Sequence, residues 1–127
     1  MTNLIETLAE HPATEVVRRN GLADFLSRHP RAMLFFTGDV AAHPEALDVA
    51  IVVRELLRQY AGRLTLGLVD RRDEAAVMAR TGVVVLPAVA FVSDGKPVDV
   101  VARMRDWSAY AQAAEKLFPP ETRTVAP

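Results

Sequence analysis

"ARTGVVVLPAVAFVSDGKPV", residues 79–98, is the stretch that decides the fold. Gly82 follows a short helical pattern, at the position where a helix end in the left-handed conformation favours glycine. Pro87 cannot donate a backbone hydrogen bond to a sheet, so we expect the strand to begin directly after it. Asp94-Gly95 is typical of a two-residue hairpin turn, and the residues after it predict a returning antiparallel strand. The stretch therefore predicts a helix, a loop and a β-hairpin, in that order.

The segment upstream of this stretch predicts a βαβ unit. "RAMLFFT", residues 31–37, is an apolar run without alternation, which is typical of a strand buried on both faces. "HPEALDVAIVVRELLRQYAG", residues 43–62, predicts an amphipathic helix with Pro44 in its first turn. "RLTLGLVD", residues 63–70, is predicted as the second strand of the unit. With the hairpin, these elements predict an α/β domain that has a mixed sheet and helices on both faces.

The segments outside this region predict three more helices and one short strand. "NLIETLAEHP" and "NGLADFLSRHP" show helical spacing ended by proline, and "TEVV" between them is a strand candidate. "DWSAYAQAAEKLF" predicts a last helix in which Trp107 and Tyr110 face the sheet. We expect a single domain over residues 1–127, made of an N-terminal extension (1–30), a core (32–118) and a loose tail (119–127).

The composition is that of an ordinary globular protein. The chain has 127 residues, enough for one domain with a hydrophobic core; half of them are hydrophobic and 24% are charged. The formal net charge of −1 gives no overall field that favours nucleic acid or an anionic membrane. No apolar run is long enough to span a membrane, and the N-terminus does not resemble a signal peptide. We therefore expect a cytoplasmic protein.

The chain contains no cysteine, and this excludes several kinds of chemistry. Disulfides, cysteine-ligated zinc, iron–sulfur clusters and thiol nucleophiles all require sulfur that the chain does not have. The histidines, His11, His29 and His43, are far apart, and each is followed by proline, a dipeptide typical of turns and helix starts. We expect neither a metal site nor a cofactor.

The order of elements and two of the stretches resemble thioredoxin. "QYAGRLTLGLVD" looks like the end of the long thioredoxin helix and the central strand after it. "ARTGVVVLPAVAFVSDGKPV" looks like the segment that contains the cis-proline and the hairpin. The resemblance covers Met33 to Phe118 without a gap in its informative part, and Pro87 falls on the cis-proline. It implies a thioredoxin-like three-layer α/β/α fold with a mixed β-sheet and a cis-Pro loop.

The same resemblance implies that thioredoxin chemistry is absent. The first catalytic cysteine matches His43 and the resolving cysteine matches Ala46. The buried acid of thioredoxin matches Thr37, and the lysine that often partners it matches Leu68. Because thiol–disulfide exchange needs two sulfur atoms, we expect a protein that is not an enzyme. Arg103 stands where thioredoxins have a small glycine, and its long side chain is expected to cover part of the groove.

A narrower family is similar to the chain through "LFFTGD", "LVDRRDE" and "VLPAVAFV". These stretches resemble the bacterial hydrogenase expression/formation family, the HyaE/HupG/HoxO-like accessory proteins encoded with membrane-bound uptake [NiFe]-hydrogenases. The resemblance implies a redox-inactive maturation chaperone that holds the hydrogenase small-subunit precursor and its twin-arginine signal peptide. Other hydrogenase maturation proteins and a second copy of the chain are further partners consistent with it.

Two groups of residues are predicted to contact such a partner. The loop before the strand of the hairpin offers backbone groups to an extended peptide, and its residues are Val85, Leu86 and Pro87. The ends of two parallel strands gather acids that suit guanidinium groups: Asp39, Glu45, Asp70, Asp73 and Glu74, with His43 beside them. The acids also fit helix starts, and Arg71 and Arg72 lie among them and could pair with them internally.

Two other classes of function remain open. A docking or dimerisation module would use the same face without acting as a peptide chaperone. An enzyme on this frame, such as a glutathione-using transferase with a hydroxyl in place of cysteine, normally needs an additional helical domain. The chaperone is the preferred hypothesis.

Overall fold

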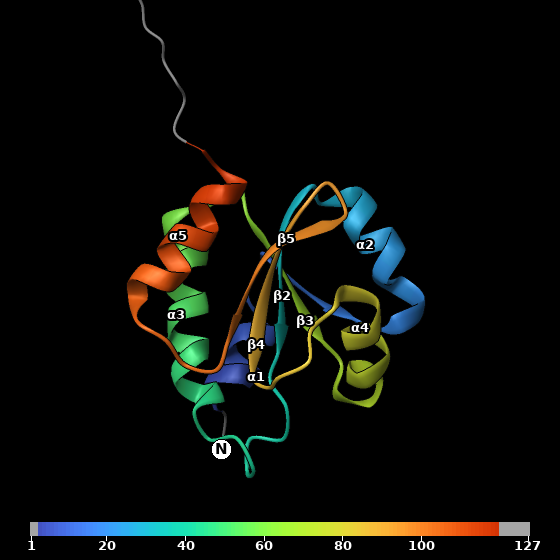
Figure 1. The fold of residues 1–127 in the computed structure, drawn as a ribbon, viewed down its shortest axis with the longest axis vertical. Coiled ribbons are helices and arrows are strands. Elements are labelled where there is room, and N and C mark those ends of the chain that lie inside the picture. Colours follow the sequence, from blue (N-terminus) through green and yellow to red (C-terminus); the bar gives the residue numbers. More distant parts are fainter. Residues whose placement is uncertain (1–2, 120–127) are drawn as a thin grey trace, which may run out of the picture.

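The computed structural model describes residues 3–119 and contains every predicted helix and strand (Figure 1). Of the predicted tail, residues 120–127 lie outside the described residues. The elements are α1 (Leu4–Ala9), β1 (Thr14–Val17), α2 (Leu22–Arg28), β2 (Arg31–Phe36), α3 (Ala46–Gln59), β3 (Thr65–Val69), α4 (Glu74–Thr81), β4 (Ala88–Ser93), β5 (Lys96–Ala102) and α5 (Trp107–Leu117). Short 3₁₀ turns, η1 (Arg19–Gly21) and η2 (Arg71–Asp73), precede α2 and α4.

The five strands form one mixed sheet in the order β1-β3-β2-β4-β5. β1, β3 and β2 run parallel, whereas β4 is antiparallel to β2 and β5 is antiparallel to β4. The carboxyl ends of the parallel strands therefore meet at one end of the sheet, together with the start of β4 and the end of β5. This end is at the bottom of Figure 1.

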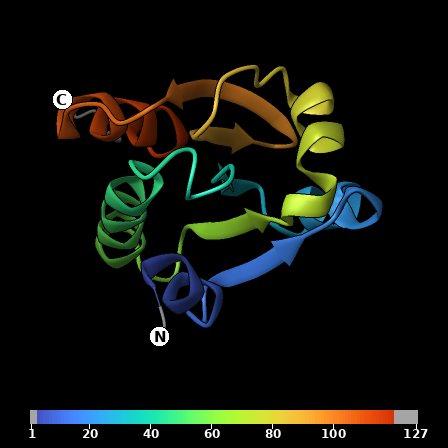
Figure 2. The same cartoon turned by 90° about the horizontal axis from the view of Figure 1, so that it is seen from below.

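Helices cover both faces of the sheet, as the sequence predicts (Figure 2). Residues of α1, α3 and α5 pack with one face of the strands into the larger hydrophobic cluster. Residues of α2 and α4 pack with the other face into a second cluster. The fold is therefore a three-layer α/β/α arrangement.

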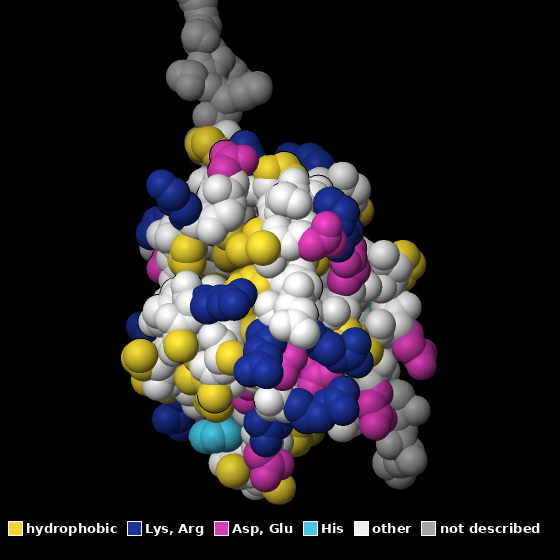
Figure 3. Space-filling view, turned by 90° about the vertical axis from the view of Figure 1, so that its right-hand side faces the viewer, with side chains coloured by type: hydrophobic (Ala, Val, Ile, Leu, Met, Phe, Trp, Pro, Cys, Tyr) yellow, Lys and Arg dark blue, Asp and Glu magenta, His cyan; other side chains and the backbone are white. Residues whose placement is uncertain are grey.

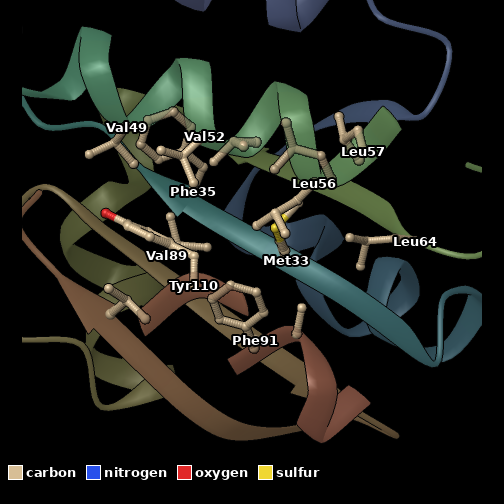
Figure 4. Packing of buried hydrophobic residues seen from close by; sticks show 14 of the residues in the cluster. Met33, Phe35, Val49, Val52, Leu56, Leu57, Leu64, Val89, Phe91 and Tyr110 are labelled. Atoms are coloured by element: carbon tan, nitrogen blue, oxygen red, sulfur yellow. The ribbon is translucent and has the colours of Figure 1, made fainter. Parts of the chain in front are cut away.

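β2 shows why the central strand is apolar without alternation. Met33 and Phe35 point into the larger cluster, whereas Leu34 and Phe36 point into the second one. All four side chains are fully buried. In the larger cluster, Met33 and Phe35 meet residues of α3, β4 and α5, among them Tyr110 (Figure 4). Complete burial of an apolar side chain of this size contributes roughly 1.5–3 kcal/mol, so the two faces of β2 anchor both layers.

The backbone around the hairpin follows the sequence signals. Gly82 ends α4 in the left-handed conformation, with a φ of +77°. Asp94 and Gly95 both have positive φ in the turn between β4 and β5. The Leu86–Pro87 peptide bond is cis.

One predicted core residue is wrong. Tyr110 is completely buried, but Trp107 is 42% exposed. Trp107 is the first residue of α5, and the buried stripe of this helix begins one turn later, at Tyr110. Within residues 3–119, no helix has the length and apolar character needed to cross a membrane.

Candidate functional site

The candidate site lies at the end of the sheet where the parallel strands finish (Figure 1). Four connections gather there, and they are residues 37–45 after β2, 70–73 after β3, 82–87 before β4 and 103–106 after β5. Ligands of open α/β sheets bind preferentially at the carboxyl ends of the strands. All the predicted site residues lie in these connections or at the start of α4.

The connections 37–45 and 82–87 pack closely against each other at Gly38. Its φ is +67°, a backbone conformation that favours glycine. A Cβ atom at this position would lie 2.8 Å from Cδ2 of His43 and 3.4 Å from the side chain of Leu86. The position that the resemblance equates with a catalytic cysteine therefore holds a partly buried imidazole packed on the Gly38 backbone.

Glu74, the first residue of α4, is buried and bonded within the protein. Its side chain is only 3% exposed. Oε2 accepts a hydrogen bond from the Gly38 N–H at 3.0 Å, and Oε1 accepts one from Nη1 of Arg71 at 2.9 Å. Thr37 is also buried and donates its hydroxyl to the Gly38 carbonyl. A carboxylate thus lies behind this loop, but it comes from α4 and holds the loop in place.

Glu45 and Arg103 form an ion pair between the start of α3 and the connection after β5. Nε of Arg103 lies 2.6 Å from Oε2 of Glu45, and this contact holds the pKa of Glu45 below its ordinary value. Arg103 has a φ of +66°, and its carbonyl accepts the hydroxyl of Tyr110 at 3.0 Å. Its backbone N–H donates to the carbonyl of Pro87 at 2.7 Å. The side chain of Arg103 thus reaches toward α3.

Asp70 and Asp73 bind basic or N–H groups of the same chain. Asp70 forms ion pairs with Arg18 and Arg72, and its carboxylate also accepts the Arg72 N–H. The Arg72 guanidinium, with these other contacts, holds the pKa of Asp70 well below its usual range. Asp73 accepts a hydrogen bond from the Arg19 N–H at 2.9 Å. Asp70 therefore already has guanidinium partners within the chain, whereas Asp73 accepts only a backbone N–H among the described residues.

Residues 84–87, which we call the ledge, present the opposite situation. Val84 is 84% exposed and Val85 is 40% exposed, although both are apolar. Among the described residues, the backbone N–H and C=O groups of residues 84–86 have no hydrogen-bond partner. Leu86 is partly buried against Gly38, and Pro87 is buried. The ledge therefore offers unpaired backbone groups next to exposed apolar side chains.

The side chains of three predicted contact residues lie in the interior or in internal contacts. Glu74 and Pro87 are buried, so their side chains do not reach the surface of the site. Glu45 is engaged by Arg103. Asp39 is exposed, and its carboxylate accepts only the N–H of Ala41 among the described residues. Three of the five predicted acids, Glu45, Asp70 and Glu74, thus have an arginine partner within the protein.

Sequence reasoning missed that Val84 and Trp107 are exposed apolar residues at this end, because Val84 lies in a predicted loop and Trp107 is predicted to face the sheet. Met104, in the connection after β5, is 40% exposed as well. The signal available in the sequence is the run of three valines before Leu86, which lies outside every predicted helix and strand. Burial still varies within this run, because Val83 is buried and Val84 is exposed. Across residues 3–119, no three histidine or acidic side chains lie close enough together to hold a metal ion.

The fold and this end of the sheet define a thioredoxin-like protein without the cysteines of thioredoxin. The chain is similar to a mutant thioredoxin from Halobacterium salinarum NRC-1, with a TM-score of 0.68, 20% sequence identity, and coverage of 90% of this chain and 94% of that one. At this identity the similarity concerns the fold alone.

The sequence comparison is more specific. The family model of the hydrogenase-1 expression protein HyaE matches residues 4–110, and the chain belongs to this family. It is 37% identical to the hydrogenase expression/formation protein HupG of Rhizobium leguminosarum bv. viciae, over 93% of this chain and 82% of that protein. It is 34% identical to the hydrogenase expression/formation protein HoxO of Cupriavidus necator, over 89% of this chain and 71% of that protein.

Proposed function

We propose that the protein is a redox-inactive chaperone, not an enzyme, that acts in the maturation of an uptake [NiFe]-hydrogenase. In this proposal it works in the cytoplasm and holds the small-subunit precursor by its twin-arginine signal peptide. Family membership supports the link to hydrogenase production. The absence of cysteine from the sequence supports a role without thiol–disulfide exchange.

The ledge is the observation that carries the proposal. An extended peptide can pair with the unpaired backbone groups of residues 84–86, which gives affinity with little demand on its side chains. Val84 and Val85 are exposed beside these groups and would be buried by apolar residues of the peptide. A signal peptide has an apolar central segment of roughly 7–15 residues, which could supply backbone groups and apolar side chains to the ledge together.

The ion pairs within the site favour the apolar segment of the signal peptide, and not its arginine pair, as the main contact with the protein. A partner's guanidinium group that binds Asp70 must displace Arg18 or Arg72. It then replaces one charged contact with another of similar strength, so little free energy is gained. Burial of Val84 and Val85 displaces no existing contact. We therefore assign the ledge to the apolar segment of the signal peptide.

The test compares the small-subunit precursor with the same subunit lacking its signal peptide. Each is passed over the immobilised protein, and a synthetic signal peptide is then added as a competitor. We expect the precursor to be retained at least about tenfold more tightly, and the peptide to release it. Equal retention of both forms, or of neither, contradicts signal-peptide binding.

A second candidate function, a dimerisation or docking module, is favoured by one further observation. β5 is an edge strand, and Val98 and Val100 on it are 40% and 36% exposed. Edge strands with exposed apolar residues pair readily with another chain. Light scattering after size exclusion, with and without precursor, separates the two functions. A stable dimer that neither dissociates when precursor is added nor forms a complex with it would favour the docking module.

A further inference from the structure

A second surface, on the side of the sheet covered by α4, is rich in arginine. We call it the arginine face, and it consists of Arg18, Arg19, Arg71, Arg72 and Arg80. Arg18 follows β1 and Arg19 begins η1. Arg71 and Arg72 lie in η2, within the 70–73 connection of the candidate site, and Arg80 lies in the last turn of α4. Figure 3, which looks at this side of the molecule, shows Lys and Arg side chains around a smaller group of acidic ones.

The guanidinium groups of this face are fixed but not saturated. Arg18, Arg71 and Arg72 have side chains that are 61%, 52% and 79% exposed. Each guanidinium carries five N–H donors, and Arg72 uses two of them on Asp70. The side chain of Arg19 makes no hydrogen bond or ion pair to any residue in the described part of the chain. Many N–H donors therefore remain available, and those of Arg18, Arg71 and Arg72 are on side chains already held by carboxylates.

The arginine face carries an excess of positive charge in a chain that is slightly acidic overall. Five arginines surround the carboxylates of Asp70, Asp73 and Glu74, which leaves a formal excess of two positive charges, whereas the whole chain has a formal net charge of −1. The carboxylates of Asp70 and Glu74 hold the guanidinium groups of Arg18, Arg71 and Arg72 in place before any partner arrives, which lowers the entropy lost on binding. Planar guanidinium groups held in this way suit carboxylates.

We propose that the arginine face is a docking surface for an acidic segment of a protein partner, separate from the ledge. Two features favour a polypeptide over a nucleic acid. The three embedded carboxylates limit the excess to two positive charges, which suits a short acidic segment better than the dense, regular row of phosphates of a nucleic acid. Among the described residues, Trp107 is the one aromatic residue in the set of exposed large hydrophobic side chains. It lies on α5, across the sheet from this face, so no exposed aromatic side chain is available here for base stacking.

The test uses the full chain and a fluorescein-labelled peptide of alternating glutamate and serine, measured by fluorescence anisotropy. The face variant carries Arg18→Gln, Arg19→Gln and Arg72→Gln. The control variant removes the same charge elsewhere through Arg54→Gln, Arg58→Gln and Arg105→Gln. We expect the face variant to bind at least about tenfold more weakly, and the control to change by less than about threefold. Added salt should weaken binding to the unmodified protein.

Arg19→Gln alone keeps the test valid if the triple variant does not fold, because it leaves every described ion pair intact. This single change should weaken binding about twofold to threefold, whereas Arg54→Gln alone, its matched single control, should leave binding unchanged. Equal loss in the face and control variants would overturn the proposal, as would no binding of the peptide at low salt. Tighter binding of an oligothymidylate than of the acidic peptide would assign the surface to nucleic acid instead.

Discussion

Two parts of the candidate site differ in how their polar groups are bonded: its carboxylates and the backbone of the ledge. Glu45, Asp70 and Glu74 each have an arginine partner within the chain. The backbone groups of residues 84–86 have no hydrogen-bond partner among the described residues, and Val84 stands almost fully in solvent. The charged side chains look like a binding site in the sequence, yet they hold the loops together. The surface open to a partner is the apolar one.

Magnitudes explain why this difference matters for binding. An exposed ion pair contributes about 0–1 kcal/mol, and exchanging one guanidinium partner for another gains less than that. Burial of apolar surface contributes roughly 25 cal/mol per Å², so covering a valine that is 84% exposed offers more. The four predictions below test this comparison, from the largest expected effect to the smallest.

The first prediction concerns the structural role of the buried carboxylate. Glu74→Ala should lower the free energy of unfolding by about 3 kcal/mol, because the buried Gly38 N–H and Arg71 lose a charged partner. Urea denaturation measures the change. Asp39→Ala is the matched control, since Asp39 is exposed and its carboxylate accepts only the Ala41 N–H among the described residues, and it should cost about 1 kcal/mol or less. Similar losses in both variants would contradict a structural role specific to Glu74.

Much of the fold could be predicted because its signals are local. Gly82, Asp94 and Gly95 adopt positive φ where the sequence predicts a helix end and a hairpin turn. The unbroken apolar run of β2 correctly indicates burial on both faces. Trp107 was misplaced because helical spacing gives the side of a helix that a residue occupies. It does not show whether the first turn has already reached the core.

The location of the site could be predicted from the sequence, but which of its side chains are paired or exposed could not. The residues are brought to one end of the sheet by topology alone. Their pairing depends on contacts between distant residues. Arg18 and Asp70 are 52 positions apart, and Glu45 and Arg103 are 58 positions apart. No periodic pattern reports such pairs. The exposure of Val84 depends in the same way on what the rest of the chain leaves uncovered.

The second prediction tests the ledge directly. Val84→Asp should weaken binding of the small-subunit precursor at least about tenfold, because it places a charge against the apolar segment of the signal peptide. Stability should change by less than about 0.5 kcal/mol, since the side chain is already exposed. Binding is measured by calorimetry and stability by urea denaturation.

Ile51→Asp is the control for this change. Ile51 is 45% exposed on α3 and lies outside the four connections of the site. It should leave precursor binding unchanged. If both substitutions weaken binding equally, the effect comes from added negative charge and the ledge is not the contact surface.

The third prediction concerns the twin arginines of the precursor. Their replacement by lysines should weaken binding less than about threefold, because the carboxylates of the site already have arginine partners in the chain. Replacement of apolar residues in the same signal peptide by serine should weaken binding more. The two peptide series are compared by competition against the labelled precursor. A larger effect of the arginine replacements would mean that the carboxylates exchange partners on binding.

The last prediction concerns the Glu45–Arg103 ion pair, where we expect the smallest effect. Its hydrogen bond lowers the pKa of Glu45 in the folded state, so the stabilising contact is fully present above the unfolded value of about 4.3. The contact is lost as the pH falls below that value and through the folded pKa. Carbon-detected NMR should show Glu45 titrating at a lower pH in the unmodified protein than in Arg103→Gln. An identical midpoint in both would mean that the ion pair does not persist in solution, and that Arg103 leaves this part of the site open.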